Sequence, residues 1–185
     1  MTLTLRDYQD PLDVIWIETA RRLDIEIRRD AEVFAAWDGE RVLTLGTPET
    51  LDPDDSLAQL IFHELCHALV EGPSRFHLPD WGLENRDTRD ELHELACLRL
   101  QAALADRYGL RRFLAATTDY RPHYAELPPF PLGDRTHPAV VLALPGWERA
   151  TTGPWAKPLA AALQATATIL QVTRPFAPPN SLWRS

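Results

Sequence analysis

The spacing of apolar residues predicts a helix followed by a small sheet near the start of the chain. Asp10 and Pro11 suit the N-cap and the first position of a helix, and apolar residues then recur every three or four positions up to Arg22. Alternating apolar and polar residues follow at 25–28, and the turn pair Asp38-Gly39 separates two further apolar runs. We therefore expect three short antiparallel strands after the first helix.

Two longer helical patterns follow the predicted sheet. The first can be capped by Asp52 or Asp54 and stops at Gly72, a residue suited to a helix C-terminus. The second opens with a capping box at Thr88 and runs to Gly109. The two helices are close in sequence, so we expect them to pack on one another.

The last third of the chain is less periodic. Residues 120–138 are rich in proline and aromatic residues and predict an ordered loop, whereas the apolar run 138–144 fits a strand or a short buried helix equally well. Residues 155–172 predict a final helix, and the proline-rich tail 175–185 is either flexible or packed on the surface. The expected fold is α+β, in a single domain that spans residues 1–185.

A His-Glu-x-x-His pattern at residues 63–67 lies inside the first of these two helices. Residues four apart share one face of an α-helix, so His63 and His67 can direct nitrogen atoms at one metal ion. Glu64 lies about 100° around the helix, where a carboxylate can act as general base on a metal-bound water. The alternative is a buried helix whose histidines bond to backbone carbonyls or acids.

Charge and composition narrow the class of partner. The formal net charge is −8, and no basic cluster is present that could neutralise a run of phosphates, so nucleic-acid binding is not expected. No long apolar run predicts a signal peptide or a membrane span. We expect a cytoplasmic protein with no membrane partner, in which Cys66 and Cys97 stay reduced.

A catalytic metal site of this kind needs a third protein ligand besides the two histidines. The metzincin pattern is excluded, because Val70 and Pro73 occupy the positions where it requires glycine and histidine. Several downstream side chains remain as candidates for the third ligand: Glu94, Glu91, His93, Asp80 and His77. Four further side chains in the irregular segment could stabilise an oxyanion, although a structural role is favoured for each: Tyr120, His123, Tyr124 and His137.

The helix-borne His63-Glu64-x-x-His67 pattern, followed by a helix that carries Glu94, resembles the gluzincin-type zincins. This resemblance implies a zinc ion held by His63, His67 and Glu94, with Glu64 activating a water molecule to hydrolyse an amide bond. It also implies that a peptide or protein substrate lies along a strand edge such as 42–45. The position of Asp80 after the second histidine resembles the third ligand of aspzincin-like enzymes instead.

The chain is also similar in length and layout to the elongation factor P hydroxylase family. The matching residues are the His63–His67 pattern and, more loosely, Gly72, Asp80-x-Gly82 and Glu94. That resemblance implies Fe²⁺ in place of Zn²⁺ and hydroxylation of a modified lysine on a translation factor. A zinc hydrolase of peptidase type is our leading expectation. The alternatives are an iron-dependent protein hydroxylase and a non-catalytic interaction domain stabilised by its metal.

Overall fold

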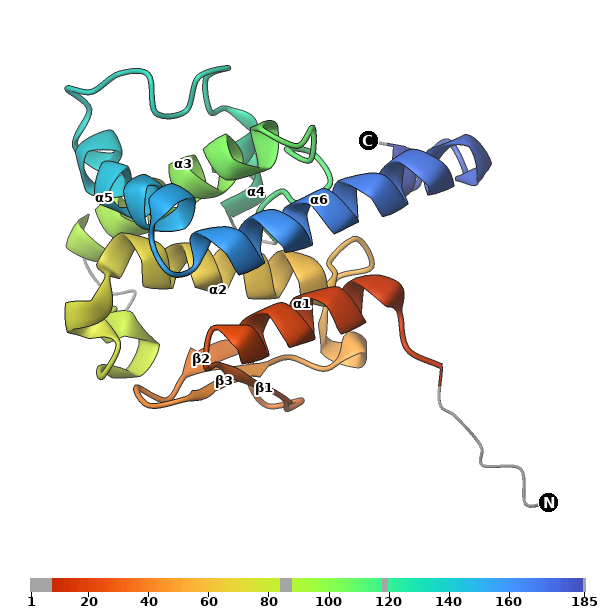
Figure 1. Cartoon of the computed structure of the whole chain (residues 1–185), viewed down its shortest axis with the longest axis horizontal. Helices are drawn as coiled ribbons and strands as arrows, with labels where there is room; N and C mark the ends of the chain where they lie inside the picture. The colour runs from red at the N-terminus through yellow and green to blue at the C-terminus, as the bar shows by residue number, and fades with distance from the viewer. Residues whose placement is uncertain (1–7, 84–87, 118–119, 185) are drawn as a thin grey trace.

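The computed structural model describes residues 8–83, 88–117 and 120–184 (Figure 1). A small sheet and a set of helices lie in separate parts of the molecule, so the predicted α+β class is confirmed. The helices and strands follow in chain order as α1 Pro11–Arg22, β1 Glu26–Arg29, β2 Ala35–Trp37, β3 Val42–Leu45, α2 Leu57–Glu71, α3 Thr88–Asp106, α4 Arg121–Ala125, α5 Pro138–Thr152 and α6 Ala156–Thr173. Short 3₁₀ helices are η1 Pro48–Thr50, η2 Pro73–Arg75, η3 Pro79–Gly82, η5 Arg174–Phe176 and η6 Leu182–Arg184.

The sheet is mixed, which corrects the prediction that it is antiparallel throughout. Its strand order is β1-β3-β2, with β3 antiparallel to β2 and parallel to β1. Asp38 and Gly39 form the predicted tight turn, since Gly39 has a φ of 80° and the Asp38 carboxylate accepts hydrogen bonds from the amides of residues 40–42. Because β3 is paired on both sides, its residues 42–45 are not the free strand edge expected for a substrate.

Helix α2 lies in the middle of the molecule, between α1 with the sheet on one side and α3 with α5 on the other (Figure 1). It begins after Ser56, whose hydroxyl accepts from the Gln59 amide, so the caps predicted at Asp52 or Asp54 are wrong. It ends at Gly72 as predicted, with a φ of 76°. Almost every side chain of α2 is buried, which fixes the position of its two histidines.

The segment 138–144, which the sequence left open between a strand and a short helix, is helical and forms the first part of α5. Its N-cap is His137, whose Nδ1 accepts from the Ala139 amide at 3.1 Å. Gly146 lets α5 approach both α2 and α3, since a Cβ there would lie 2.9 Å from Leu100 and 3.1 Å from the Leu69 carbonyl. Helix α3 begins at Thr88, but the side chain of the predicted capping box at Thr88 lies outside the described residues.

The proline-rich tail packs against the rest of the chain up to residue 184. The Trp183 ring lies 4.8 Å from the ring of Phe113, centroid to centroid.

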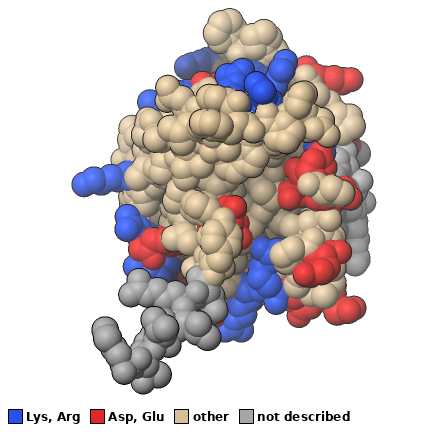
Figure 2. All heavy atoms as spheres, turned by 90° about the vertical axis from the view of Figure 1, so that its right-hand side faces the viewer, with Lys and Arg blue, Asp and Glu red and all other residues tan. Residues whose placement is uncertain are grey.

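On the side shown in Figure 2, a broad uncharged area is bordered by basic and acidic side chains in separate small groups. Within the described part of the chain, no helix has both the length and the hydrophobicity to cross a bilayer.

Candidate metal centre

Three donor side chains from α2 and α3 converge on one point. The Nε2 atoms of His63 and His67 lie 3.1 Å apart. Glu94, in the second turn of α3, brings Oε2 to 3.0 Å from His67 Nε2 and Oε1 to 3.5 Å from His63 Nε2. The sequence spacing therefore translates into a compact triangle of two nitrogens and a carboxylate, with Glu94 the carboxylate that meets both histidines.

All three donor side chains are nearly closed off from solvent. Their exposed fractions are 14% for His63, 8% for His67 and 5% for Glu94. Glu94 Oε1 and His67 Nδ1 are buried and have no hydrogen-bond partner. A buried carboxylate oxygen without a partner is costly, and a cation beside it removes that cost. The donor set and the orphaned Glu94 oxygen both fit a divalent metal.

The electrostatics of the triangle favour a positive charge at its centre. Burial lowers the pKa of His67, but the surrounding carboxylates, Glu94 first and then Glu64 and Glu71, together outweigh burial and raise that pKa to about 9. Burial raises the pKa of Glu94, but His67 and His63 together have the larger, opposite effect. The net result is a pKa of about 2. Without a metal, the site therefore holds an ionised carboxylate and a protonated histidine. The proton occupies the position that a metal cation would take.

Gln101, which was not among the predicted site residues, controls which nitrogen of His63 faces the triangle. Its Oε1 lies 2.9 Å from His63 Nδ1, and its amide nitrogen donates to the Leu114 carbonyl at 2.9 Å. The second contact fixes the amide so that its oxygen faces the imidazole, which places a proton on Nδ1 and leaves the Nε2 lone pair for a metal. No local sequence pattern marks a buried glutamine for this role.

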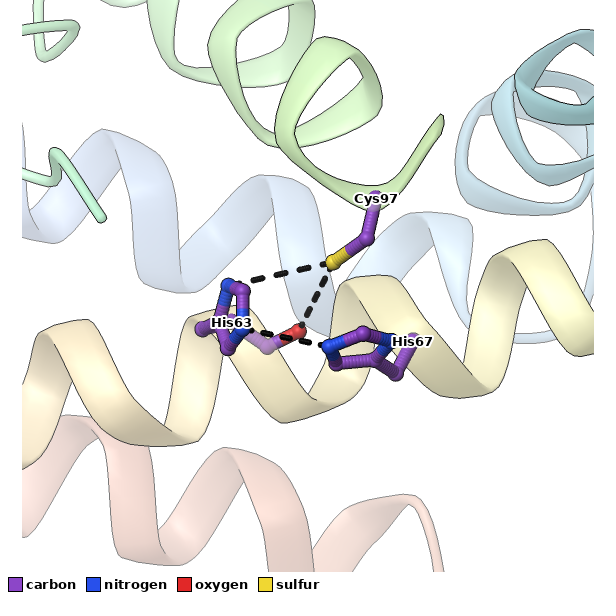
Figure 3. A group of neighbouring side chains, drawn as sticks. All are labelled: His63, His67 and Cys97. Carbon is purple, nitrogen blue, oxygen red and sulfur yellow. Dashed lines mark hydrogen bonds between the residues drawn. The ribbon is translucent and has the colours of Figure 1, made fainter. Parts of the chain in front are cut away.

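Cys97, which was not among the predicted ligands, is a further neighbour of the two histidines. His63, His67 and Cys97 place one donor atom each within 4.8 Å of the others (Figure 3). However, the sulfur lies 3.8 Å from Nδ1 of His63, which Gln101 occupies, and donates to the His63 carbonyl at 3.6 Å. Burial raises the thiol pKa well above its ordinary value, so Cys97 is not a ready thiolate. Of these two neighbours, only Glu94 has an oxygen within 3.5 Å of the Nε2 atom of each histidine.

Glu64 lies beside the triangle and is held by a tryptophan. The Trp81 indole donates from Nε1 to Glu64 Oε2 at 3.2 Å, which leaves the other carboxylate oxygen available for a water molecule. Trp81 reaches this position through a turn in which both Asp80 and Trp81 have positive φ, 47° and 57°. Its ring stacks on Trp37, with centroids 4.4 Å apart. Trp81 therefore orients the predicted base.

The other candidates for the third ligand have different roles. Asp80 accepts a hydrogen bond from the Trp37 amide at 2.9 Å, and His77 and Glu91 are exposed. His93 Nδ1 lies 2.5 Å from Oε1 of Glu71, a buried carboxylate that also pairs with Arg75 at 3.1 Å. These contacts stabilise the turn after α2 and its packing on α3.

The side chains considered for an oxyanion role do not converge on the triangle. Tyr124 is buried in a small apolar cluster, His123 is exposed beside Tyr120, and His137 caps α5.

Comparisons of the chain with protein-family models, with curated proteins and with solved structures find no match. The chemistry of the site therefore follows from its own residues alone.

Proposed function

We propose that the protein is a zinc-dependent hydrolase of peptidase type, with the metal held by His63, His67 and Glu94. The observation that carries the proposal is the convergence of two imidazole nitrogens and one carboxylate: the two Nε2 atoms lie 3.1 Å apart, Glu94 Oε2 lies 3.0 Å from His67 Nε2, and Glu94 Oε1 lies 3.5 Å from His63 Nε2. Ligands at the usual zinc distances in a tetrahedral site lie about 3.3 Å from one another. The observed distances bracket this value, so a metal needs little rearrangement of the side chains.

Glu64 supports hydrolysis over mere metal storage. A bound zinc ion would polarise a carbonyl oxygen and lower the pKa of a water molecule. Glu64 accepts a proton from this water as its oxygen adds to the amide carbon. The carbon–nitrogen bond then breaks, and the proton passes from Glu64 to the leaving nitrogen, so that a carboxylic acid and an amine are released. Trp81 holds the carboxylate in place during both proton transfers.

An iron-dependent protein hydroxylase is the second candidate, because the same triangle also suits an octahedral ion. Three ligands on one face of such a site lie about 3.0 Å apart, and two of the observed distances are 3.0 and 3.1 Å. An oxygenase, however, needs no carboxylate in the position of Glu64. This neighbour is the reason to place the hydrolase first.

The test combines metal analysis with a Glu64→Gln variant. We expect protein purified without added metal to contain zinc and to cleave members of a peptide mixture, read by mass spectrometry. Glu64→Gln should keep its zinc and lose activity by roughly 10²- to 10⁴-fold. Glu91→Gln, which changes an exposed carboxylate on α3, is the matched control and should behave as wild type.

Three results would overturn this proposal. Full activity in Glu64→Gln would remove the general base. Bound iron with oxygen-dependent turnover would establish the hydroxylase instead. Unfolding on chelation, with no turnover of any peptide, would indicate that the metal only joins α2 to α3.

A further inference from the structure

An apolar pocket lies at the C-terminal end of α2, apart from the metal triangle. Its volume is about 270 Å³, and the side chains that decide its character are Ala68, Phe76, Pro154, Trp155 and Arg149. Phe76 and Trp155 meet edge to face, with ring centroids 5.4 Å apart. Small-molecule and cofactor pockets usually measure about 300–1,000 Å³, so this pocket has the size for one large side chain.

The pocket is on the same face of α2 as the predicted base. Ala68 follows Glu64 by four positions, which places it about 6 Å further along the helix and nearly in line with Glu64. Phe76, in the pocket wall, also packs against Trp81, with ring centroids 5.3 Å apart. The Trp81 indole in turn donates its hydrogen bond to the Glu64 carboxylate. A substrate with one side chain in the pocket therefore has its neighbouring backbone close to Glu64.

One cation stands at this otherwise apolar pocket. Arg149 Nη1 donates to the carbonyls of Leu69 at 2.5 Å and Val70 at 3.3 Å, which fixes the guanidinium against the end of α2. Among the described residues, no carboxylate lies within ion-pair distance of Arg149. A fixed guanidinium with free donors binds a carboxylate well. The pocket thus offers an apolar cavity together with a site for one anion.

We propose that this pocket receives the C-terminal residue of a peptide, with a large apolar side chain in the cavity and the terminal carboxylate on Arg149. This inference rests on the proposed function, since it names the substrate class of the same site. A peptide rises about 3.3 Å per residue, so the bond nearest Glu64 is the last or the second-last peptide bond. The reaction class is release of an apolar residue, or a dipeptide that ends in one, from the C-terminus.

Binding to metal-free protein tests the pocket without requiring activity. The probes are N-acetyl-L-phenylalanine and its C-terminal amide, added in the presence of a chelator and followed by tryptophan fluorescence. The acid should bind about tenfold more tightly than the amide, because only the acid pairs with the guanidinium. Arg149→Gln should abolish this difference, and Trp155→Ala should weaken both probes.

Arg99→Gln is the matched control, because Arg99 also donates to a carbonyl, that of Pro131 at 2.8 Å, but lies outside the pocket. It should leave both affinities unchanged. Equal binding of acid and amide, or an equal loss in Arg99→Gln, would overturn the proposal. The peptide Ala-Ala-Phe should bind at least as tightly as the acid. If hexanoate, a small free acid, binds and this peptide does not, the pocket accepts small free acids only and the proposal is wrong. Zinc content is measured separately, so failure here is distinct from failure of the hydrolase proposal.

Discussion

The Nδ1 atom of His63 lies 2.9 Å from Oε1 of Gln101, a residue 38 positions further along the chain. Gln101 is fully buried, and its amide nitrogen is committed to the Leu114 carbonyl. One helix thus supplies the histidine, and the next supplies the group that sets its tautomer. The candidate metal site depends on the contact between α2 and α3 as much as on the pattern within α2.

Replacing Gln101 with leucine should lower zinc affinity about 10- to 100-fold, because the Nδ1 proton of His63 loses its acceptor. Affinity is measured by competition with a coloured chelator. Gln59→Leu is the control, since Gln59 is also buried but forms its side-chain hydrogen bonds with the Ala115 carbonyl, at 3.3 Å, and with the Ser56 hydroxyl. An equal loss in both variants would show a general packing effect.

Glu94→Gln and Cys97→Ala distinguish the two neighbours that could complete the site. Loss of the Glu94 charge should weaken zinc binding more than about 100-fold, beyond the usual effect of a residue that only supports a ligand. Cys97→Ala should leave zinc affinity nearly unchanged and cost about 1 kcal/mol of stability from lost packing. Zinc titrations and denaturant unfolding of both variants test this. The reverse pattern would make Cys97 the ligand.

Zinc binding should release a proton at neutral pH. Burial lowers the pKa of His67, but the carboxylates of Glu94, Glu64 and Glu71 together raise it to about 9, so Nε2 is protonated in the metal-free protein. Zinc must displace about one proton at pH 7.5 and nearly none above about pH 10. Calorimetry in buffers of different ionisation enthalpy counts these protons. A proton count independent of pH would contradict the paired state of His67 and Glu94.

The same raised pKa predicts how the metal-free protein responds to pH. The stability that protonated His67 contributes is complete below about pH 6.5, the ordinary histidine value, and is lost as the pH rises through about 9. The lowered pKa of Glu94 acts at the other end, where its contribution disappears as the pH falls from about 4.5 through about 2. Thermal unfolding in chelator, from pH 6 to 10, should show the first decline.

Trp81→Phe removes the hydrogen bond to Glu64 but keeps an aromatic ring. We expect peptide cleavage to fall about tenfold with unchanged zinc content, since the loss of one hydrogen bond to a charged group is of that size. Trp37→Phe is the control, because its indole donates to the Phe76 carbonyl at 2.8 Å and not to Glu64. It should lower stability while the activity per folded molecule remains.

Gly146→Ala should destabilise the fold, although alanine is the better helix former. A Cβ at this position lies 2.9 Å from Leu100 Cδ2 and 3.1 Å from the Leu69 carbonyl oxygen, so the buried Leu100 side chain must shift and α5 must move slightly away from α2. Such overpacking costs about 1–3 kcal/mol, more than the roughly 0.5–1 kcal/mol that alanine gains by propensity. Denaturant unfolding at fixed zinc concentration measures the difference, and increased stability would contradict this packing.

Local signals predicted the long helices α1, α2, α3 and α6 and the α+β class, whereas the pairing between distant segments could not be predicted. The segment 120–138 was predicted to be a loop, but it contains the short helix α4. Asp10 and Pro11 marked the start of α1 because a cap acts on the next two or three residues. The mixed sheet was missed because the alternation in a strand does not state which neighbour it pairs with. The cap of α2 was misplaced because aspartates and Ser56 are equally good caps, and only packing decides between them.

In the candidate site, too, the features that depend on local sequence were predicted and those that depend on packing between helices were not. Helical period alone places His63 and His67 on one face, and they do lie together. Glu94 was the preferred one of several acidic or histidine candidates, and the relative rotation of α2 and α3, which is set by their packing, brings it to both histidines. Gln101 and Trp81 could not be foreseen, because their roles depend on contacts across many positions. The identity of the metal and the hydrolase activity stay predictions.

The central place of β3 in the sheet bears on the order in which the chain can fold. During synthesis β1 and β2 emerge first, yet both pair with β3, which is made after them. Until residue 45 has emerged, neither β1 nor β2 has its partner. The antiparallel β2–β3 hairpin can then close before the parallel β1–β3 pair, because the loop that joins β2 to β3 is shorter than the segment between β1 and β3. Slow addition of β1 would therefore be the kinetic signature of this sheet.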